Sequence, residues 1–322
     1  MNKEMKKSMC VIIFVWVILF VVFPSMAAEY PSKPVTIVPP WGAGGAIDTI
    51  SRALAQATKT HLGQPIIVEN KPGGGGTVGT SYVLTKPPDG YILGITSLPP
   101  TLVSYFMGKL DFHPVDDFTY IMRVCGYFFG IVVRVDAPWK NIQEFIEHCK
   151  SNPGKVSYAS SGVGSTGHAA FEEFASLAGI KLMHIPYKGG DTNTALLGGH
   201  VDAISDASWH PLVEAGKFRL LAIYVEKRSP RYPNIPTVKE LGYNMVRPGP
   251  INLFGPKGLP KPIVKTIHDA FKMGMNDPIF ASALEKFNMP ALYLNTEECE
   301  KAVRADFEPF KKLVENLGLA KK

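Results

Sequence analysis

Two strand-to-helix turns of the same kind constrain the fold of this chain most strongly. In each turn a β-rich run enters a loop of small residues, and a segment with helical periodicity follows. The first turn is Gly42-Ala-Gly-Gly-Ala-Ile-Asp48, and the second, about 120 residues later, is Gly162-Val-Gly-Ser-Thr-Gly-His168. Since one domain commonly has about 100 to 200 residues, the simplest arrangement is two α/β domains with one turn each.

The rest of the chain alternates short β-rich runs with helix-period segments, which predicts mainly parallel sheets flanked by helices. Apolar residues at positions 50, 54 and 57 mark the core face of one helix, and those at 142, 145, 146 and 149 mark another. The segment 261–317 is predicted to be almost wholly helical. Strands are predicted at residues 35–38, 66–69, 91–95, 130–135, 156–160, 183–186, 203–205, 220–225 and 251–254.

The chain is expected to cross between the two domains near residue 131 and to return near residue 251. Arg247-Pro-Gly-Pro250 has the composition of a linker at the return point. The prediction is a first domain of residues 28–131 plus 252–322 and a second domain of residues 132–251. The C-terminal helices are expected to pack on the first domain.

Residues 1–27 have the composition of a secretory signal peptide. Three lysines precede an uninterrupted apolar run at residues 11–23, and Ser25 and Ala27 supply small residues before a cleavage site. A membrane anchor is the alternative, but the apolar run is shorter than the about 20 residues needed to span a bilayer. The mature chain is therefore expected to begin at Ala28.

The composition argues against several classes of protein. A hydrophobic content of 46% argues against disorder. Loss of residues 1–27 lowers the formal net charge from +6 to +4, and no long basic run remains, so nucleic acid is a poor candidate partner. The remaining cysteines, Cys125, Cys149 and Cys299, are too few and too widely spaced for a disulfide framework, although one pair could bridge.

The two turns have the features of an anion site. Glycine lets backbone amides approach a ligand, and a helix N-terminus adds unpaired N–H donors and a partial positive charge. Such a site suits a carboxylate or phosphate, and two facing domains would hold one anion from both sides. The structural alternative is that the glycines only permit tight turns. Trp41 and Trp209 either line such a cleft or pack in the core.

Polar side chains in the turns also have two interpretations. Ser165 and Thr166 either cap the second helix or give a hydroxyl to a ligand, and capping is the commoner use. His168 is either an anion partner or a structural histidine. Asp48 complements the helix dipole by default, and a functional Asp48 would instead accept a ligand group or orient water.

Two patterns that resemble enzyme sites are weak. Gly74-Gly-Gly-Thr-Val-Gly79 satisfies the dinucleotide pattern G-x-G-x-x-G, but Lys71-Pro72 separates it from the preceding strand. Ser165 lies in Val-Gly-Ser-Thr-Gly, which lacks the first glycine of the hydrolase pattern G-x-S-x-G. We therefore expect no catalytic residue.

Two acid–histidine pairs are weak candidates for metal binding. His168 with Glu172 and His200 with Asp202 each lack a third ligand, and such pairs are more often ordinary surface pairs. We expect no metal site and no cofactor.

A series of longer blocks identifies a family resemblance. They include Tyr30-Pro-Ser-Lys-Pro, Leu62-Gly-Gln-Pro, the glycine run Gly73-Gly-Gly-Gly76, Ile185-Pro-Tyr-Lys-Gly189 and Gly198-Gly-His-Val-Asp202. Together with the two turns and in this order, they resemble the substrate-binding proteins of tripartite tricarboxylate transporters, the Bug or TctC-like family. The resemblance covers nearly the whole mature chain.

The resemblance implies a periplasmic-binding-protein fold, also called a Venus flytrap, in which two α/β domains close on a small organic anion, typically a carboxylate. It implies a periplasmic, non-enzymatic monomer that delivers its ligand to a membrane permease of one large and one small subunit. Together the turns and the resemblance give these candidate ligand-binding residues: Trp41, Gly42, Ala43, Gly44, Gly45, Asp48, Ser97, Ser160, Gly164, Ser165, Thr166, Gly167, His168, Tyr187, Lys188 and Asp206.

The chain departs from the family pattern at two places. Trp41 stands where phenylalanine is common, and the segment after Asp206 is shorter than usual. Two other functions remain open. The first is presentation of the same ligand to a membrane sensor kinase, and the second is that of an exported hydrolase.

Overall fold

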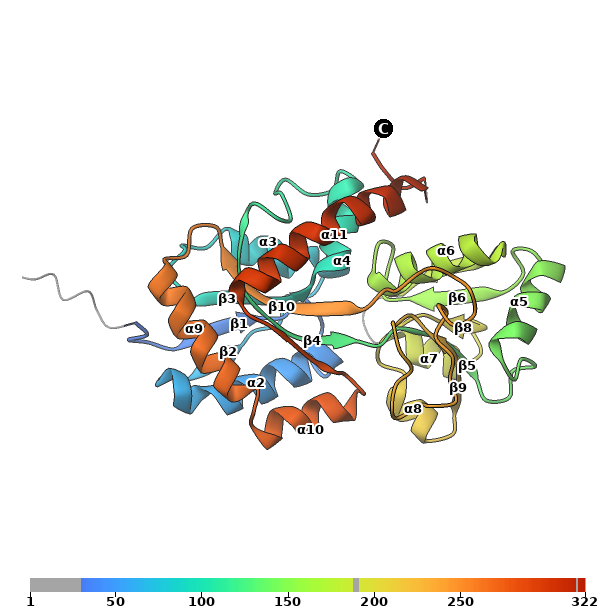
Figure 1. Cartoon of the computed structure of the whole chain (residues 1–322), viewed down its shortest axis with the longest axis horizontal. Coiled ribbons are helices and arrows are strands. Elements are labelled where there is room, and N and C mark those ends of the chain that lie inside the picture. The colour runs from blue at the N-terminus through green and yellow to red at the C-terminus, as the bar shows by residue number, and fades with distance from the viewer. Residues whose placement is uncertain (1–29, 188–190, 317, 322) are drawn as a thin grey trace, which may run out of the picture. The chain divides into compact units, whose positions relative to one another are not determined.

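Two β-sheets organise the chain in the computed structural model (Figure 1). The structure describes residues 30–187, 191–316 and 318–321, so the predicted signal peptide and Lys188 lie outside the described residues. Residues 33–322 form one compact unit, to which the description below applies.

The first sheet has six strands in the order β11-β4-β10-β3-β1-β2. These strands are β1 (Val35–Val38), β2 (Ile66–Val68), β3 (Ile92–Ser97), β4 (Phe118–Tyr127), β10 (Gly249–Pro256) and β11 (Ala291–Leu294). The second sheet has five strands in the order β7-β6-β8-β5-β9. These are β5 (Gly130–Arg134), β6 (Ser157–Ser160), β7 (Met183–Pro186), β8 (Ala203–Ile204) and β9 (Phe218–Ile223).

Both sheets are mixed, so the predicted mainly parallel arrangement is wrong in that respect. Strand β1 pairs in parallel with β2 and β3, and β6 pairs in parallel with β7 and β8. The neighbours of β10 and of β5 are all antiparallel to them. Strand β4 carries the chain out of the first sheet and β10 brings it back alongside, so the two run in opposite directions.

Two strands were not predicted. Strand β4 spans ten residues that are rich in aromatic and β-branched side chains, and β11 lies within the segment 261–317 that the sequence predicts as helical. Strand β11 pairs with β4 at the edge of the first sheet. The helical periodicity of the segment is interrupted only over the residues of β11, and the edge of β4 offers these residues a strand to pair with.

Six helices and one 3₁₀ turn accompany the first sheet (Figure 1). They are α2 (Ala46–Leu62), η1 (Gly74–Gly76), α3 (Thr77–Leu84), α4 (Leu98–Phe106), α9 (Lys261–Gly274), α10 (Pro278–Lys286) and α11 (Thr296–Asn316). Helices α9 and α10 pack on α2, while α11 packs on α4 and β4. The predicted core face of α2 is confirmed, since Ile50, Leu54 and Ala57 are buried.

Four helices accompany the second sheet: α5 (Ile142–Ser151), α6 (Thr166–Ala178), α7 (Asp191–Leu197) and α8 (His210–Glu214). The predicted core face of α5 is confirmed, because Ile142, Phe145, Ile146 and Cys149 are buried. Trp209 is buried in the same part of the fold, where its Nε1 donates to the Phe128 carbonyl at 3.1 Å, so it packs in the core.

The chain passes between the sheets at two places. It leaves the first sheet between Tyr127 and Gly130, and it returns between Ile223 and Gly249. On the return segment, Arg247 pairs with Glu173 of α6 at 2.6 Å and lies over the ring of Phe310 in α11. The domain division at residues 131/132 and 251/252 stays a prediction.

The three cysteines within the described residues, Cys125, Cys149 and Cys299, are buried free thiols. No described helix is both long and apolar enough to cross a membrane.

Candidate functional site

A cavity of about 540 Å³ lies where the two turns meet. Nine of the predicted residues line it: Trp41, Gly42, Ala43, Gly44, Gly45, Ser97, Ser165, Thr166 and Asp206. The size lies within the range of about 300 to 1,000 Å³ that is common for small-molecule sites. The prediction that both turns contribute to one concave site therefore agrees with the geometry.

The first turn presents free backbone donors at the start of α2. Gly45 precedes the helix and supplies no side-chain cap. Within the described chain, the amides of Ala46 and Ile47 have no acceptor, as expected for the first residues of a helix without a cap. Both residues line the cavity, so these donors and the positive end of the helix dipole face it.

Asp48 holds the first turn from behind. Its carboxylate accepts the Gly44 amide at 2.8 Å and pairs with Arg52 at 2.9 Å. Burial favours a higher pKa for Asp48, but the hydrogen bonds from Arg52 and Gly44 hold the pKa below its ordinary value. Asp48 is buried and outside the cavity lining, so in this structure it supports the loop.

The second turn repeats this arrangement at the start of α6. The Gly164 amide donates to Nδ1 of His168 at 3.2 Å, just as Gly44 donates to the side chain four residues on. Gly44 has φ 82° and Gly164 has φ 83°, a left-handed conformation that favours glycine. The two turns, which are similar in sequence, therefore also have similar backbone geometry.

Ser165 caps α6, as the commoner interpretation of its hydroxyl predicts. Its Oγ accepts the His168 amide at 3.3 Å and donates to Ser160 Oγ at 3.2 Å. Ser165 also lines the cavity, so capping leaves it in reach of a ligand. The imidazole of His168 accepts from the Gly164 amide and is not bonded to the Ser165 hydroxyl, so Ser165 and His168 do not form the serine–histidine pair of a hydrolase.

His168 lies behind the turn and is uncharged near neutral pH. Burial and the neighbouring His184 lower the pKa of His168 to about 3. The two rings are 4.2 Å apart between centroids, and His184 Nε2 lies 2.8 Å from the Oγ of the buried Ser160. His168 is outside the cavity lining, so of its two interpretations the structure favours the structural one.

Three further predicted residues lie behind the cavity. A Cβ at Gly167 would come within 1.9 Å of the Ser205 carbonyl oxygen, so this glycine permits close packing of α6 on the chain after β8. A Cβ at Gly164 would lie 3.1 Å from the Val103 side chain of α4, a tighter than usual contact with a side chain and not with backbone. Tyr187 is half-buried and packs on the core beside Trp209.

Two residues that line the cavity from the side of the first sheet carry buried polar atoms without partners. Trp41 packs its ring against Gly76, where a Cβ would lie 3.0 Å from the ring. In the part of the chain that is described, neither Trp41 Nε1 nor Ser97 Oγ has a hydrogen-bond partner. Both residues line the cavity, and Ser97 is only 2% exposed. Such buried polar atoms are costly unless a ligand or water satisfies them.

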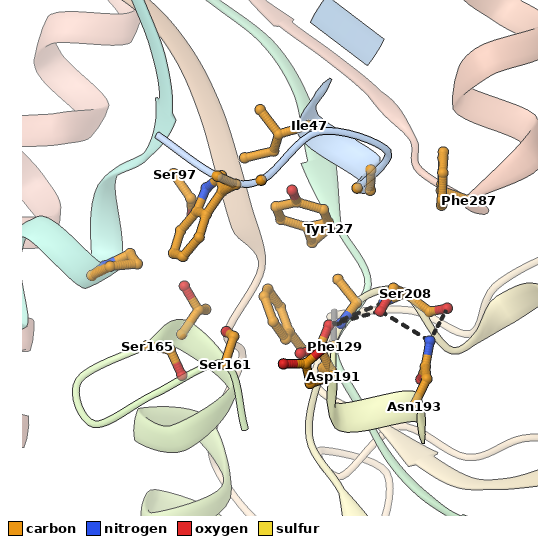
Figure 2. Close-up of a pocket in the computed structure, with 18 of the residues that line it drawn as sticks. Ile47, Ser97, Tyr127, Phe129, Ser161, Ser165, Asp191, Asn193, Ser208 and Phe287 are labelled. Carbon is orange, nitrogen blue, oxygen red and sulfur yellow. Dashed lines mark hydrogen bonds between the residues drawn. The ribbon is translucent and has the colours of Figure 1, made fainter. Parts of the chain in front are cut away.

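Aromatic side chains that were not predicted form the walls. Tyr127 and Phe129 flank the crossing from β4 to β5, and their ring centroids lie 5.4 Å apart. Figure 2 shows both rings between the loop of Ile47 and Asp191, with Phe287 at the rim. No motif marks these residues, because the crossing of the chain between the sheets brings them to the cavity.

Polar residues near α7 and β8 form the remaining side. Asp206 is 9% exposed and accepts hydrogen bonds from the Ala207 amide at 2.6 Å and from the Thr192 hydroxyl at 3.2 Å. Burial raises the pKa of Asp206, although these donors and those of Ser208 oppose the rise. Sequence reasoning missed these lining residues: Ala46, Ile47, Pro100, Tyr127, Phe129, Ser161, Asp191, Asn193, Ala207, Ser208 and Phe287.

The polar groups of the site suit binding. Among the described residues, no cluster of three or more His, Cys, Asp or Glu side chains could hold a metal ion. What the cavity offers is a set of backbone and hydroxyl donors at two helix N-termini, an arrangement that holds an anion.

Comparison with known proteins identifies the family. The model of the tripartite tricarboxylate transporter family receptor, TctC, matches residues 50–319. The chain belongs to this receptor family. A curated TctC relative, the UPF0065 protein in the gbd 5' region of Cupriavidus necator, is 42% identical over 92% of this chain and 91% of its own length.

Solved structures of TctC-family relatives share the fold. The periplasmic binding protein BugD has a TM-score of 0.84 and 31% identity, with 91% of this chain and 100% of BugD covered. MatC of Rhodopseudomonas palustris, solved with bound malate, has a TM-score of 0.82 and 26% identity, with 88% of this chain and all of MatC covered. This TctC-family chain therefore has the mixed α/β fold of periplasmic solute-binding receptors.

Proposed function

We propose that this chain is an exported solute receptor that captures a small organic anion by its carboxylate. The observation that carries the proposal is the meeting of two helix N-termini at one cavity, where the amides of Ala46 and Ile47 lack acceptors among the described residues. Each helix N-terminus carries about half a unit of positive charge, so the two together match the single negative charge of one carboxylate. The malate bound to MatC supports the same ligand class.

The rest of the proposal concerns export and delivery. Residues 1–27 direct the chain to the periplasm and are removed. The domains, residues 28–131 plus 252–322 and residues 132–251, close on the ligand by bending at the two crossings. The closed monomer then delivers the ligand to a membrane permease of one large and one small subunit. The protein performs no reaction, because binding is all that delivery requires.

A thermal-shift screen of carboxylates tests the binding step. Protein freed of co-purified ligand should gain about 2.7 kcal/mol of stability when a ligand is present at a hundredfold excess over its Kd. The melting temperature should rise with ligand concentration. The absence of a shift with any carboxylate would contradict the proposal.

A substitution at Gly42 separates binding from folding. A Cβ at Gly42 meets no atom within 4 Å, and its φ is not in the left-handed region. Gly42→Val should therefore place methyl groups in the cavity while leaving the melting temperature of the free protein nearly unchanged. Loss of the ligand-induced shift in this variant is the expected result, and an undiminished shift would mean that the first turn does not hold the anion.

A further inference from the structure

One tyrosine brings an unpaired hydroxyl to the cavity. Tyr127 is the last residue of β4, it lines the cavity, and only 9% of it is exposed. Within the described chain its hydroxyl has no hydrogen-bond partner. The buried Tyr120 differs, because its hydroxyl donates to the Pro114 carbonyl oxygen at 2.7 Å. The buried Tyr158 likewise donates to the Glu172 carboxylate at 2.6 Å, so the fold uses these two hydroxyls and leaves that of Tyr127 free.

The hydroxyl of Tyr127 opens onto the cavity. By contrast, the Nε1 of Trp41, the Oγ of Ser97 and the hydroxyl of Tyr224, which also lack partners in the described structure, are enclosed by protein. The Tyr127 hydroxyl is not enclosed, although the residue as a whole is buried, so a group in the cavity can reach it. Figure 2 shows this hydroxyl turned toward the turn that carries Ile47. It therefore points to the start of α2, where the first turn presents its free amides.

The ring of Tyr127 is held where the chain returns to the first sheet. Gly249, the first residue of β10, pairs with Tyr127 across the two strands. A Cβ at Gly249 would lie 2.5 Å from Phe129 Cε2 and 3.1 Å from Tyr127 Cδ2, so both rings pack on bare backbone. The rings also meet edge to face. The hydroxyl is thus placed before a ligand arrives, which lowers the entropy lost on binding.

The chemistry of this hydroxyl suits a carboxylate. Burial raises the pKa of Tyr127 well above its ordinary value, and the nearby Cys125 and Asp206 add to the rise. The phenol therefore keeps its proton near neutral pH and can donate it in a hydrogen bond. A carboxylate has two oxygens with about four acceptor sites, so the amides at the start of α2 leave room for a further donor.

We propose that the Tyr127 hydroxyl donates a hydrogen bond to the carboxylate that the first turn holds. Tyr127 is then a ligand-binding residue on the strand by which the chain leaves the first sheet, and not only a part of the cavity wall. A wall alone would need only the ring, which phenylalanine supplies equally well. The inference rests on the proposed carboxylate binding and adds to it a donor outside both turns.

The substitution Tyr127→Phe tests the inference, because it removes the hydroxyl and keeps the ring. Six acids serve as probes: malate, succinate, adipate, glutamate, benzoate and 4-hydroxybenzoate. Titration calorimetry on ligand-free protein should give, for every acid that the wild type binds, a Kd at least tenfold higher in the variant, since hydrogen bonds to charged groups are among the stronger ones. The melting temperature of the free variant should equal that of the wild type, because the substitution removes no hydrogen bond within the described chain.

Tyr120→Phe is the matched control. Tyr120 lies on the same strand, outside the cavity lining, and its hydroxyl bonds to the Pro114 carbonyl oxygen. The melting temperature of this variant should fall, because that carbonyl loses its donor, while each Kd stays unchanged. The two variants should therefore give opposite results, one losing affinity without stability and the other losing stability without affinity.

The outcomes separate the inference from the proposed function. Wild-type affinities in Tyr127→Phe would overturn the inference and leave carboxylate binding intact. A fall in the melting temperature of free Tyr127→Phe as large as that of Tyr120→Phe would also overturn it, since the hydroxyl would then support the fold. Binding of none of the six acids by the wild type would overturn the proposed function and the inference with it.

Discussion

The amide of Gly44 donates a hydrogen bond to the carboxylate of Asp48, four residues later, at 2.8 Å. The amide of Gly164 makes the corresponding bond to His168 at 3.2 Å. In each turn a side chain on the helix thus fixes a left-handed glycine. In the first turn the amides of Ala46 and Ile47 have no acceptor among the described residues, whereas in the second turn the Ser165 amide donates to the Gly162 carbonyl oxygen at 3.1 Å. The two halves of the site are formed before any ligand arrives.

Removal of the Asp48 carboxylate should loosen the first turn. Asp48→Ala leaves the Gly44 amide without its acceptor and removes the ion pair of Arg52, which keeps only its hydrogen bond to Asn70, at a cost of about 1 to 3 kcal/mol in unfolding free energy. The Kd for the ligand should rise at least tenfold. Asp48→Asn retains an acceptor oxygen, so both its loss of unfolding free energy and its rise in Kd should be smaller. Urea unfolding and calorimetry measure the two effects, and wild-type affinity in Asp48→Ala would contradict the support role.

Two glycine substitutions should separate backbone strain from ligand binding. Gly44 and Gly258 have φ of 82° and 88°, and a Cβ at either position meets no atom within 4 Å. Alanine at either position should therefore lower the unfolding free energy by about 1 to 2 kcal/mol, because alanine is strained in the left-handed conformation. Only Gly44→Ala should also weaken binding, because only Gly44 lines the cavity. Equal affinities in the two variants would mean that the first turn does not contact the ligand.

His168 should make stability depend on pH. Burial and His184 lower its pKa to about 3 in the folded chain, whereas an unfolded histidine titrates near about 6.5. Since the unfolded state then binds more protons, the contribution is fully present above about pH 6.5 and is lost as the pH falls toward 3.

His168→Asn should keep an acceptor for the Gly164 amide and remove this titration. When the pH falls from 7 to 5, the unfolding free energy of the variant should decrease less than that of the wild type. The difference between the two proteins is at most about 1.4 kcal/mol per pH unit. Urea midpoints at the two pH values give the comparison. A steeper or equal loss in the variant would show that His168 is not buried in its neutral form. His184, whose pKa is lowered to about 4 by burial, contributes a remaining slope of the same sign.

Gly167→Ala should destabilise the fold instead of changing ligand selectivity. The added Cβ would lie 1.9 Å from the backbone carbonyl oxygen of Ser205, and a backbone atom cannot move aside easily. Overpacking of this kind typically costs about 1 to 3 kcal/mol. The melting temperature of the free protein should fall, while the relative affinities for different acids stay as in the wild type. A variant as stable as the wild type would contradict the close packing.

The sequence predicts the parts of the fold that local patterns encode. The runs before both turns form strands, and Ser165 caps the second helix as its position predicts. Local patterns do not reveal the role of β4: its residues have β propensity, but no turn signal marks it as the strand by which the chain leaves the first sheet. Pairing with β10, more than 120 residues away, decides its direction.

The aromatic walls of the site and its α7 side could not be predicted in the same way. Tyr127 and Phe129 reach the cavity because the chain crosses between the sheets there, and Phe287 reaches it from the end of α10. Asp191 had a weak signal, since it follows β7 at the start of a helix. Conversely, Gly167 and His168 belong to the second turn but lie behind it, because successive helical residues are rotated by about 100° and these two point away from the face that carries Thr166.

A crystal structure of the protein with a bound carboxylic acid would show directly whether one carboxylate lies between the two turns. We expect the carboxylate oxygens within about 3.2 Å of the amide nitrogens of Ala46 or Ile47, the usual N–H···O range. Ser165 or Thr166 should contact the same ligand from the second turn. A ligand bound outside this cavity, or one held by a single turn, would contradict this arrangement.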